Sequence, residues 1–389
     1  MKTIIGQAAR GENFFPRPLI TNEIWAKLES GSHLLLVAPR RVGKSSILFN
    51  LLDKPNPGYI VVYYTSESVN SINEFYKKLF NKILEKVSGV QKYKKKIAGI
   101  AQDLLSRIES ISVIEGGIKL GESKIQYLEM LNNLLEDINL GTDRLVVLID
   151  EFSVTVENLI RDNDESTAIN FLQTKREIRQ APQLSNKIQF IYAGSIGLEN
   201  VVGSLNSSSL INDLSPVMIH PLSILEAEGL TTKIIDSSPY SFGKSAYDYL
   251  LEKIEWYIPF FFQVLLDEID ILLIETDTKI ISKDIIDNAI SKALKKKNYF
   301  EHWYERLRKA YKGKDFIFVK ELLNIMSGKP LFKSIEIHDL AVKFNLEKTY
   351  RDLVNTLKYD GYINNENDPQ IYRFNSNLLK QWWYRNVAN

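Results

Sequence analysis

Residues 33–52 read His33-Leu-Leu-Leu-Val-Ala-Pro-Arg-Arg-Val-Gly-Lys-Ser-Ser-Ile-Leu-Phe-Asn-Leu-Leu52. The apolar run 33–37 predicts a buried strand, and the run from Ile47 predicts the start of a helix. A tight loop between such a strand and helix directs backbone N–H groups and the helix N-terminus at one point, where an anion binds. We therefore expect a phosphate-binding loop with these members: Ala38, Pro39, Arg40, Arg41, Val42, Gly43, Lys44, Ser45 and Ser46.

The loop follows the pattern Gly-x-x-x-x-Gly-Lys-Ser/Thr, with Ala38 at the first glycine. In this pattern Lys44 reaches the β- and γ-phosphates, and the Ser45 hydroxyl is a ligand of Mg²⁺. Alanine is small, so we expect the turn to be kept. The sequence thus predicts a site for ATP or ADP with Mg²⁺.

A second apolar run, Arg144-Leu-Val-Val-Leu-Ile149, ends in Asp150-Glu151. A buried carboxylate is costly unless it is paired or holds a metal, so an acidic pair at a strand end points to function. We expect Asp150 to position Mg²⁺ and Glu151 to orient the water that attacks the γ-phosphate.

Strands and helices alternate through about the first 220 residues, which predicts a parallel sheet with helices on both faces. Further strands are expected at 59–64, 187–193 and 217–220. Ser195 follows the strand expected beside the phosphate loop and is our candidate for a residue that senses the γ-phosphate. Within 90–140, an insertion begins with lysines at 92 and 94–96 and contains a hairpin-like stretch at 110–119.

From about 222 to 312 the chain is predicted to be all helical, with helices at 223–236, 244–256, 259–275, 282–297 and 299–311. Three more helices, at 316–327, 336–344 and 347–359, precede two short strands near 361–363 and 371–374, a pattern typical of a winged helix-turn-helix. We expect three domains: a P-loop core (1–221), a helical lid (222–312) and a winged helix (313–389).

Composition excludes several classes of protein. There is no cysteine among the 389 residues, so disulfides and thiolate chemistry are excluded. The four histidines are scattered along the chain, which argues against a zinc site. A net charge of +1 offers no global attraction to nucleic acid. Neither a signal peptide nor an apolar run of membrane-spanning length is evident, so we expect a cytoplasmic protein without a membrane partner.

These motifs, together with Asn13-Phe-Phe-Pro-Arg17, Leu148-Ile-Asp-Glu-Phe152, Ala193-Gly-Ser-Ile-Gly-Leu198 and Tyr299-Phe-Glu-His-Trp-Tyr-Glu-Arg-Leu307, carry a family resemblance. The sequence resembles the AAA+-related P-loop ATPases of the STAND superfamily, in its archaeal-ATPase (MNS) branch. The resemblance implies an ATPase core, a lid and a C-terminal winged helix that act as a nucleotide-dependent switch. It also implies that Pro259, in Trp256-Tyr-Ile-Pro259, lines the adenine pocket.

Three functions compete. The first is an ATP-hydrolysing switch that docks a protein partner or assembles with itself. The second is a DNA-binding ATPase of origin-recognition type, and the third is a nucleotide-gated scaffold with little turnover. The segment 292–314 has nine Lys/Arg against two Asp/Glu, interleaved with aromatic residues, which suits a nucleic-acid backbone. Aromatic residues at helical spacing more often pack in a core, so packing against the lid is the favoured alternative. The segment 315–389 has ten against nine, which favours protein docking.

Rapid phosphoryl transfer also needs an arginine near the γ-phosphate. Arg176 and Arg179 lie one helical turn apart before the strand at 187–193, where a neighbouring subunit would use them. Two arginines on a solvated helix face are the equally weighted alternative, and Arg40 and Arg41 in the loop are further candidates. If a second subunit supplies this arginine, we expect the isolated monomer to hydrolyse ATP slowly.

Overall fold

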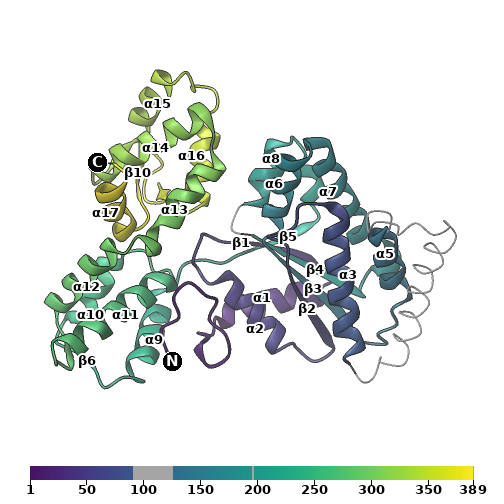
Figure 1. Ribbon diagram of the computed structural model, residues 1–389, viewed down its shortest axis with the longest axis horizontal. Coiled ribbons are helices and arrows are strands. Elements are labelled where there is room, and N and C mark those ends of the chain that lie inside the picture. The colour runs from purple at the N-terminus through teal and green to yellow at the C-terminus, as the bar shows by residue number, and fades with distance from the viewer. Residues whose placement is uncertain (91–125, 195–196, 389) are drawn as a thin grey trace, which may run out of the picture. The chain divides into compact units, whose positions relative to one another are not determined.

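A computed structural model describes residues 1–90, 126–194 and 197–388 of the chain (Figure 1). Contacts divide the chain into two compact units. The sheet unit comprises Pro16–Val37 and Lys44–Ile219, and the C-terminal unit comprises Met1–Phe15, Ala38–Gly43 and His220–Asn389. Each unit has its own apolar core.

Five parallel strands form the centre of the sheet unit, in the order β2-β3-β4-β1-β5. They are β1 (His33–Val37), β2 (Tyr59–Thr65), β3 (Arg144–Asp150), β4 (Ile188–Ala193) and β5 (Leu214–Met218). Continuous apolar strands such as β3 are what a parallel sheet needs when helices cover both of its faces. The predicted parallel sheet is confirmed.

The fifth strand begins earlier than the predicted range of 217–220. It pairs with β1 from His33↔Leu214 to Val37↔Met218, so Ser215 and Pro216 belong to it. Polar and proline residues hide a strand from an apolar-run criterion. At the edge of a sheet, however, a missing N–H is tolerated, and β5 is an edge strand.

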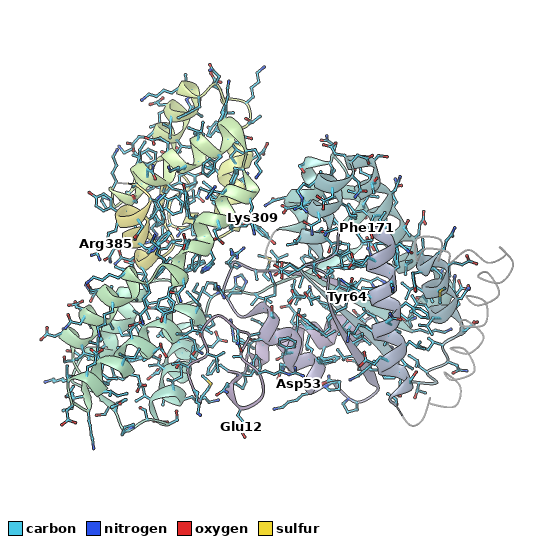
Figure 2. All side chains as sticks on the ribbon, in the orientation of Figure 1. Glu12, Asp53, Tyr64, Phe171, Lys309 and Arg385 are labelled. Carbon is cyan, nitrogen blue, oxygen red and sulfur yellow. The ribbon has the colours of Figure 1, made fainter. Side chains whose placement is uncertain are left out.

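Helices flank these strands along the sheet unit (Figure 1). They are α1 (Pro18–Glu29), α2 (Lys44–Asp53), α3 (Ile72–Ser88), α5 (Tyr127–Asp137), α6 (Phe152–Asp162), α7 (Glu165–Gln180) and α8 (Leu198–Ser204), with 3-10 turns at Pro182–Leu184 and Ser208–Ile211. Aromatic rings pack the helices against the sheet and against one another: the ring centroid of Phe75 on α3 lies 5.3 Å from that of Tyr64 on β2 and 5.0 Å from that of Phe171 on α7. Figure 2 labels Tyr64 and Phe171. The hairpin predicted at 110–119 and the basic helix start at 92–96 lie outside the described residues.

The first part of the C-terminal unit is a helical lid. Its helices are α9 (Ile224–Ile235), α10 (Ala246–Ile254), α11 (Pro259–Glu275), α12 (Lys283–Lys295) and α13 (Lys297–Ala310), and the N-terminal segment contributes a 3-10 turn, Gly11–Asn13. The expectation that this region is wholly helical is wrong, because β6 (Ser241–Phe242) and β7 (Ile280–Ile281) form a parallel pair. Two-residue strands carry no periodicity and form only where a partner supplies hydrogen bonds.

The last part of the C-terminal unit is a winged helix. Helices α14 (Gly313–Ser327), α15 (Ser334–Lys343) and α16 (Tyr350–Tyr359) accompany a three-stranded antiparallel sheet, β8-β10-β9. Its strands are β8 (Phe332–Lys333), β9 (Ile363–Asn364) and β10 (Ile371–Phe374), and α17 (Asn377–Asn386) follows. The winged helix is as predicted, whereas β8 and α17 were not anticipated.

Indole and phenyl rings join the lid to the winged helix within the C-terminal unit. Trp303 on α13 is fully buried, and its ring centroid lies 5.8 Å from that of Phe261 on α11. Phe300, one turn before Trp303, stacks on Trp382 of α17 with centroids 5.9 Å apart. By contrast, Lys309 and Arg385 are exposed (Figure 2).

Candidate functional site

The end of β3 meets the start of α2 in the sheet unit. Asp150 closes β3 and is 3% exposed, while Ser45 lies in the first turn of α2. The Ser45 hydroxyl donates a hydrogen bond of 2.9 Å to Asp150 Oδ2. Two residues 105 positions apart, both predicted to hold Mg²⁺, are therefore brought together.

Tyr63 is a member of this cluster that the sequence interpretation missed. Its hydroxyl donates to the same Oδ2 of Asp150, at 3.1 Å. Burial and then the Asp150 charge raise the pKa of Tyr63, so it remains a donor at neutral pH. The parallel register, which sets Thr65 opposite Asp150, places Tyr63 two residues earlier on the adjacent strand and on the same face of the sheet as Thr65. Only the pairing of β2 with β3 brings Tyr63 close to Asp150, and the sequence interpretation did not predict that pairing.

The electrostatics of Asp150 suit a bound cation. Burial, followed by the neighbouring charge of Glu151, raises the pKa of Asp150, and Lys44 together with the bonds from Ser45 and Tyr63 oppose this shift. A carboxylate and a hydroxyl are the hard oxygen ligands that Mg²⁺ takes alongside phosphate and water, so the residues fit this ion. In the described ranges no group of three or more His, Cys, Asp or Glu is arranged to hold a metal by itself.

Glu151 adopts a left-handed backbone, with φ 57° and ψ 31°, at the junction of β3 and α6. Residues other than glycine rarely adopt this left-handed backbone conformation, and those that do cluster at functional sites. The backbone N–H of Glu151 donates to Asp150 Oδ1 at 3.0 Å. The two acidic residues thus form one rigid corner at the carboxyl end of the sheet.

The phosphate loop ends where α2 begins, at Lys44. The N–H groups of a helix's first turn point out of its N-terminus, where an anion binds, and here the first turn contains Lys44, Ser45 and Ser46. Gly43, just before it, has φ 98°, which glycine alone adopts readily. Ala38 is buried and has no positive φ, so its backbone does not require the glycine of the general pattern.

Pro259 lies beside the loop within the C-terminal unit. It is the first residue of α11, and its Cγ is 4.0 Å from the position that a Cβ on Gly43 would occupy. The residue predicted to line the base pocket is therefore next to a glycine of the phosphate loop. The predicted sensor, Ser195, lies outside the described residues, but β4, which precedes it, lies between β1 and β3.

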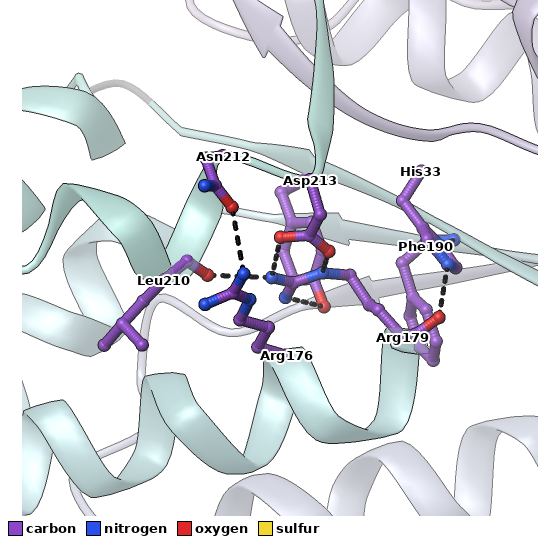
Figure 3. A network of polar contacts seen from close by, with 8 residues as sticks. His33, Arg176, Arg179, Phe190, Leu210, Asn212 and Asp213 are labelled. Atoms are coloured by element: carbon purple, nitrogen blue, oxygen red, sulfur yellow. Dashed lines mark hydrogen bonds and ion pairs between the residues drawn. The ribbon is translucent and has the colours of Figure 1, made fainter. Parts of the chain in front are cut away.

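The prediction that Arg179 supplies an arginine finger is wrong, because the structure engages its side chain within its own unit (Figure 3). Its side chain is 2% exposed, and its Nε and Nη2 donate to the two carboxylate oxygens of Asp213 at 2.7 and 2.8 Å. Nη2 also donates to the Leu210 carbonyl at 2.9 Å. A guanidinium engaged in this way is structural and cannot reach another subunit. Arg176 bonds Asn212 at 3.2 Å on the surface.

His33 connects this network to the start of β1. The Phe190 N–H donates to its Nδ1 at 3.1 Å, and its Nε2 lies 3.0 Å from the Arg179 carbonyl (Figure 3). Only the neutral ring with its proton on Nε2 satisfies both bonds. Burial lowers the pKa of His33, in agreement with this neutral form.

In the basic segment 292–314, Tyr304 is half-buried, whereas the other aromatic rings are buried and do not offer a face for base stacking. Tyr299, Trp303 and Tyr311 are 6%, 0% and 5% exposed. Two of its cations are paired with acids from other elements: Lys296 with Glu268, and Arg306 with the buried Asp360 at 3.5 Å. These three rings lie in the core, which agrees with the alternative that the aromatic residues pack against the lid rather than stack on nucleic-acid bases.

Comparison with known proteins agrees with this geometry. Residues 27–202 match the model of the family described as AAA domain, so this segment is similar to AAA-type P-loop domains. Two solved structures share the fold over nearly the whole chain. The Walker-type ATPase PABY2304 of Pyrococcus abyssi has 17% identity and a TM-score of 0.67, over 98% of this chain and 99% of that one. The ORC2 protein of Aeropyrum pernix, in ADPNP–ADP complexes, has 11% identity and a TM-score of 0.56, over 97% and 96%.

No match was found among curated proteins. Within the described ranges, no helix is both long enough and apolar enough to cross a membrane.

Proposed function

We propose that this chain is an ATP-binding and slowly ATP-hydrolysing switch of the STAND superfamily's archaeal-ATPase branch. The observation that carries the proposal is the 2.9 Å bond from Ser45 to Asp150. It joins the helix start of the phosphate loop to the acidic end of β3, which is the pair of groups that a nucleotide with Mg²⁺ requires. We place the core at 1–221, the lid at 222–312 and the winged helix at 313–389.

Each residue has a distinct part in this function. Lys44 and the N–H groups of the first turn of α2 bind the phosphates, and Ser45 and Asp150 hold Mg²⁺. The bound ion neutralises charge on the phosphate oxygens. Glu151 orients a water and accepts its proton, while Ser195 donates to the γ-phosphate or that water. Pro259 lines the base pocket.

The partner in this proposal is a protein, or a second copy of the chain. The winged helix has a nearly even charge balance, which suits protein docking better than a phosphate backbone. It also has a pocket of about 470 Å³ between α15, α16 and β10. Tyr350, Arg351 and Tyr372 line this pocket, and the exposed Ile335 lies at its wall.

Replacing Lys44 by Ala tests nucleotide binding. We expect the affinity for a fluorescent ADP analogue, measured by titration in Mg²⁺, to fall at least tenfold because the loop loses its phosphate-facing ammonium. Lys54→Ala is the matched control, because Lys54 is exposed just beyond the end of α2. Equal affinities in all three proteins would refute the assignment of the loop.

Replacing Glu151 by Gln tests hydrolysis. We expect ATP affinity to be retained and phosphate release to fall about a hundredfold, the usual effect of losing a general base. The exposed Glu165→Gln serves as control. Unchanged turnover would assign water activation to another residue. Nucleotide that co-purifies with a wild type releasing almost no phosphate would favour the nucleotide-gated scaffold instead.

A further inference from the structure

The six-residue segment Ala38–Gly43 belongs to the same compact unit as the lid and the winged helix. Along the chain it lies between β1 and α2, and it is the part of the phosphate loop that precedes Lys44. Its two arginines were considered above as members of the phosphate-binding loop and as candidate arginine fingers. The contacts of this segment within the C-terminal unit indicate another role.

Arg41 is held by the lid. Its Nε donates to Nε2 of His302 on α13 at 3.2 Å, and its guanidinium carbon lies 4.9 Å from the ring centroid of Phe260 on α11. The rings of Phe260 and His302 meet edge to face, with centroids 5.8 Å apart. A cation above an aromatic face that also donates to an imidazole is fixed in two directions.

The imidazole of His302 can accept this hydrogen bond throughout the physiological pH range. Burial first, and then the charges of Arg41 and Arg40, lower its pKa to about 2. The ring is therefore neutral at every physiological pH, and its Nε2 is an acceptor. Protonation does not break the contact, so another event has to release it.

A second contact ties the loop to the start of the wing. Gly361, between α16 and β9, has φ 82°, and a Cβ placed there would lie 3.2 Å from Pro39 Cβ and 2.5 Å from the Trp256 ring. Any side chain at this position would strain the turn and push on the loop. Next to it, the Tyr362 hydroxyl donates to the Trp303 carbonyl of α13 at 2.5 Å.

The backbone of the loop shows why these contacts matter. Arg41 adopts φ 65°, a left-handed conformation that a residue with a long side chain avoids unless its surroundings impose it. The bond to His302 and the contact with Phe260 supply that constraint. The shape of the phosphate loop thus depends on residues of the lid.

We propose that Arg41 and His302 form a latch through which the lid sets the conformation of the phosphate loop, and through which nucleotide binding is communicated to the lid and the wing turn. This rests on the proposed function, because the loop must bind nucleotide for the latch to act. Arg41 is here a positioning residue, which does not itself touch the phosphates. Linkage requires the effect to be reciprocal: a latch that tightens nucleotide binding is tightened by nucleotide in turn.

The first test is equilibrium binding of a fluorescent ADP analogue in Mg²⁺ to the full chain. Arg41→Ala and His302→Ala should each weaken binding about tenfold, and the double variant should be no weaker than either, because both changes break one contact. His302→Gln should recover much of the affinity, since its amide oxygen accepts from Arg41. Arg308→Ala, exposed on the same helix, should bind as the wild type does.

Arg41→Gly separates the latch from simple backbone strain. Glycine adopts a positive φ freely, so if conformation alone mattered, this variant would bind as well as the wild type or better. The latch predicts the same tenfold loss as in Arg41→Ala. Wild-type affinity in Arg41→Gly and His302→Ala, or additive losses in the double variant, would overturn the proposal.

Hydrogen exchange gives a readout independent of affinity. At saturating ADP, amides around His302 and around the turn at 359–364 should be protected several-fold in the wild type and not in Arg41→Ala. Absence of this protection in a wild type that binds ADP would overturn the latch and leave the nucleotide site intact. A wild type whose affinity for ADP is no higher than that of Lys44→Ala would instead refute the proposed function.

Discussion

Replacing Arg179 by Ala is expected to lower the free energy of unfolding by about 3–5 kcal/mol, the usual cost of breaking a buried ion pair. The substitution leaves the half-buried Asp213 carboxylate without its two-point donor and also removes the bond to the Leu210 carbonyl. Urea titration followed by circular dichroism measures the change. Phosphate release per folded molecule should be unaffected.

Arg176→Ala is the matched control, because Arg176 lies one turn away and makes an exposed bond to Asn212. It should change stability by less than about 1 kcal/mol, as surface contacts do. Arg179→Lys keeps the charge but not the two-point geometry, and it should lie between wild type and Arg179→Ala. A stable Arg179→Ala protein that loses hydrolysis stimulated by assembly would restore the arginine-finger assignment.

Replacing Lys175 by Met is expected to stabilise the protein at and below neutral pH. The Lys175 side chain is fully buried on α7, and no hydrogen-bond partner for its ammonium is present among the described residues. Its nitrogen lies 5.1 Å from the ring centroid of Phe75 and 5.0 Å from that of Phe190. Burial, and then the charge of Arg179, lower its pKa from 10.5 to about 7.

The sign of the pH dependence follows from this shift. Between about pH 7 and pH 10.5 the unfolded chain binds a proton at Lys175 that the folded chain does not, so stability rises with pH across this window. The full difference is on the order of 5 kcal/mol, at 1.36 kcal/mol per pKa unit. Below pH 7 both states are protonated, and the wild type carries the whole cost of the buried charge.

The measurement is the difference in free energy of unfolding between Lys175→Met and wild type at several pH values. The advantage of the variant should be largest at and below about pH 6.5 and should shrink by about 1.4 kcal/mol per pH unit between about pH 7 and pH 10. Lys187→Met, an exposed change near the start of β4, should show no such trend. A difference that does not vary with pH would mean that Lys175 remains charged in the folded protein.

The sequence predicted well wherever a local pattern carries the information. The strand–loop–helix at 33–52 and the apolar strand ending in Asp150 are local, and they lie where they were expected. The helix at 259–275 was predicted with its observed bounds, because Pro259 marks its first turn. Where pairing alone makes the element, as in β6, β7 and β8, the sequence offered no signal.

What the sequence determined by itself was the order of elements and the chemical character of the nucleotide site, because these depend on periodicity, turn residues and the spacing of a few polar groups. The partners of the arginines were decided only by the tertiary structure. Arg179 pairs with Asp213 across 34 positions, and Arg41 contacts His302 across 261. The sequence does not distinguish an arginine that faces solvent from one that binds a carboxylate or an imidazole. The role of the arginine is set by the groups that folding places within hydrogen-bond reach.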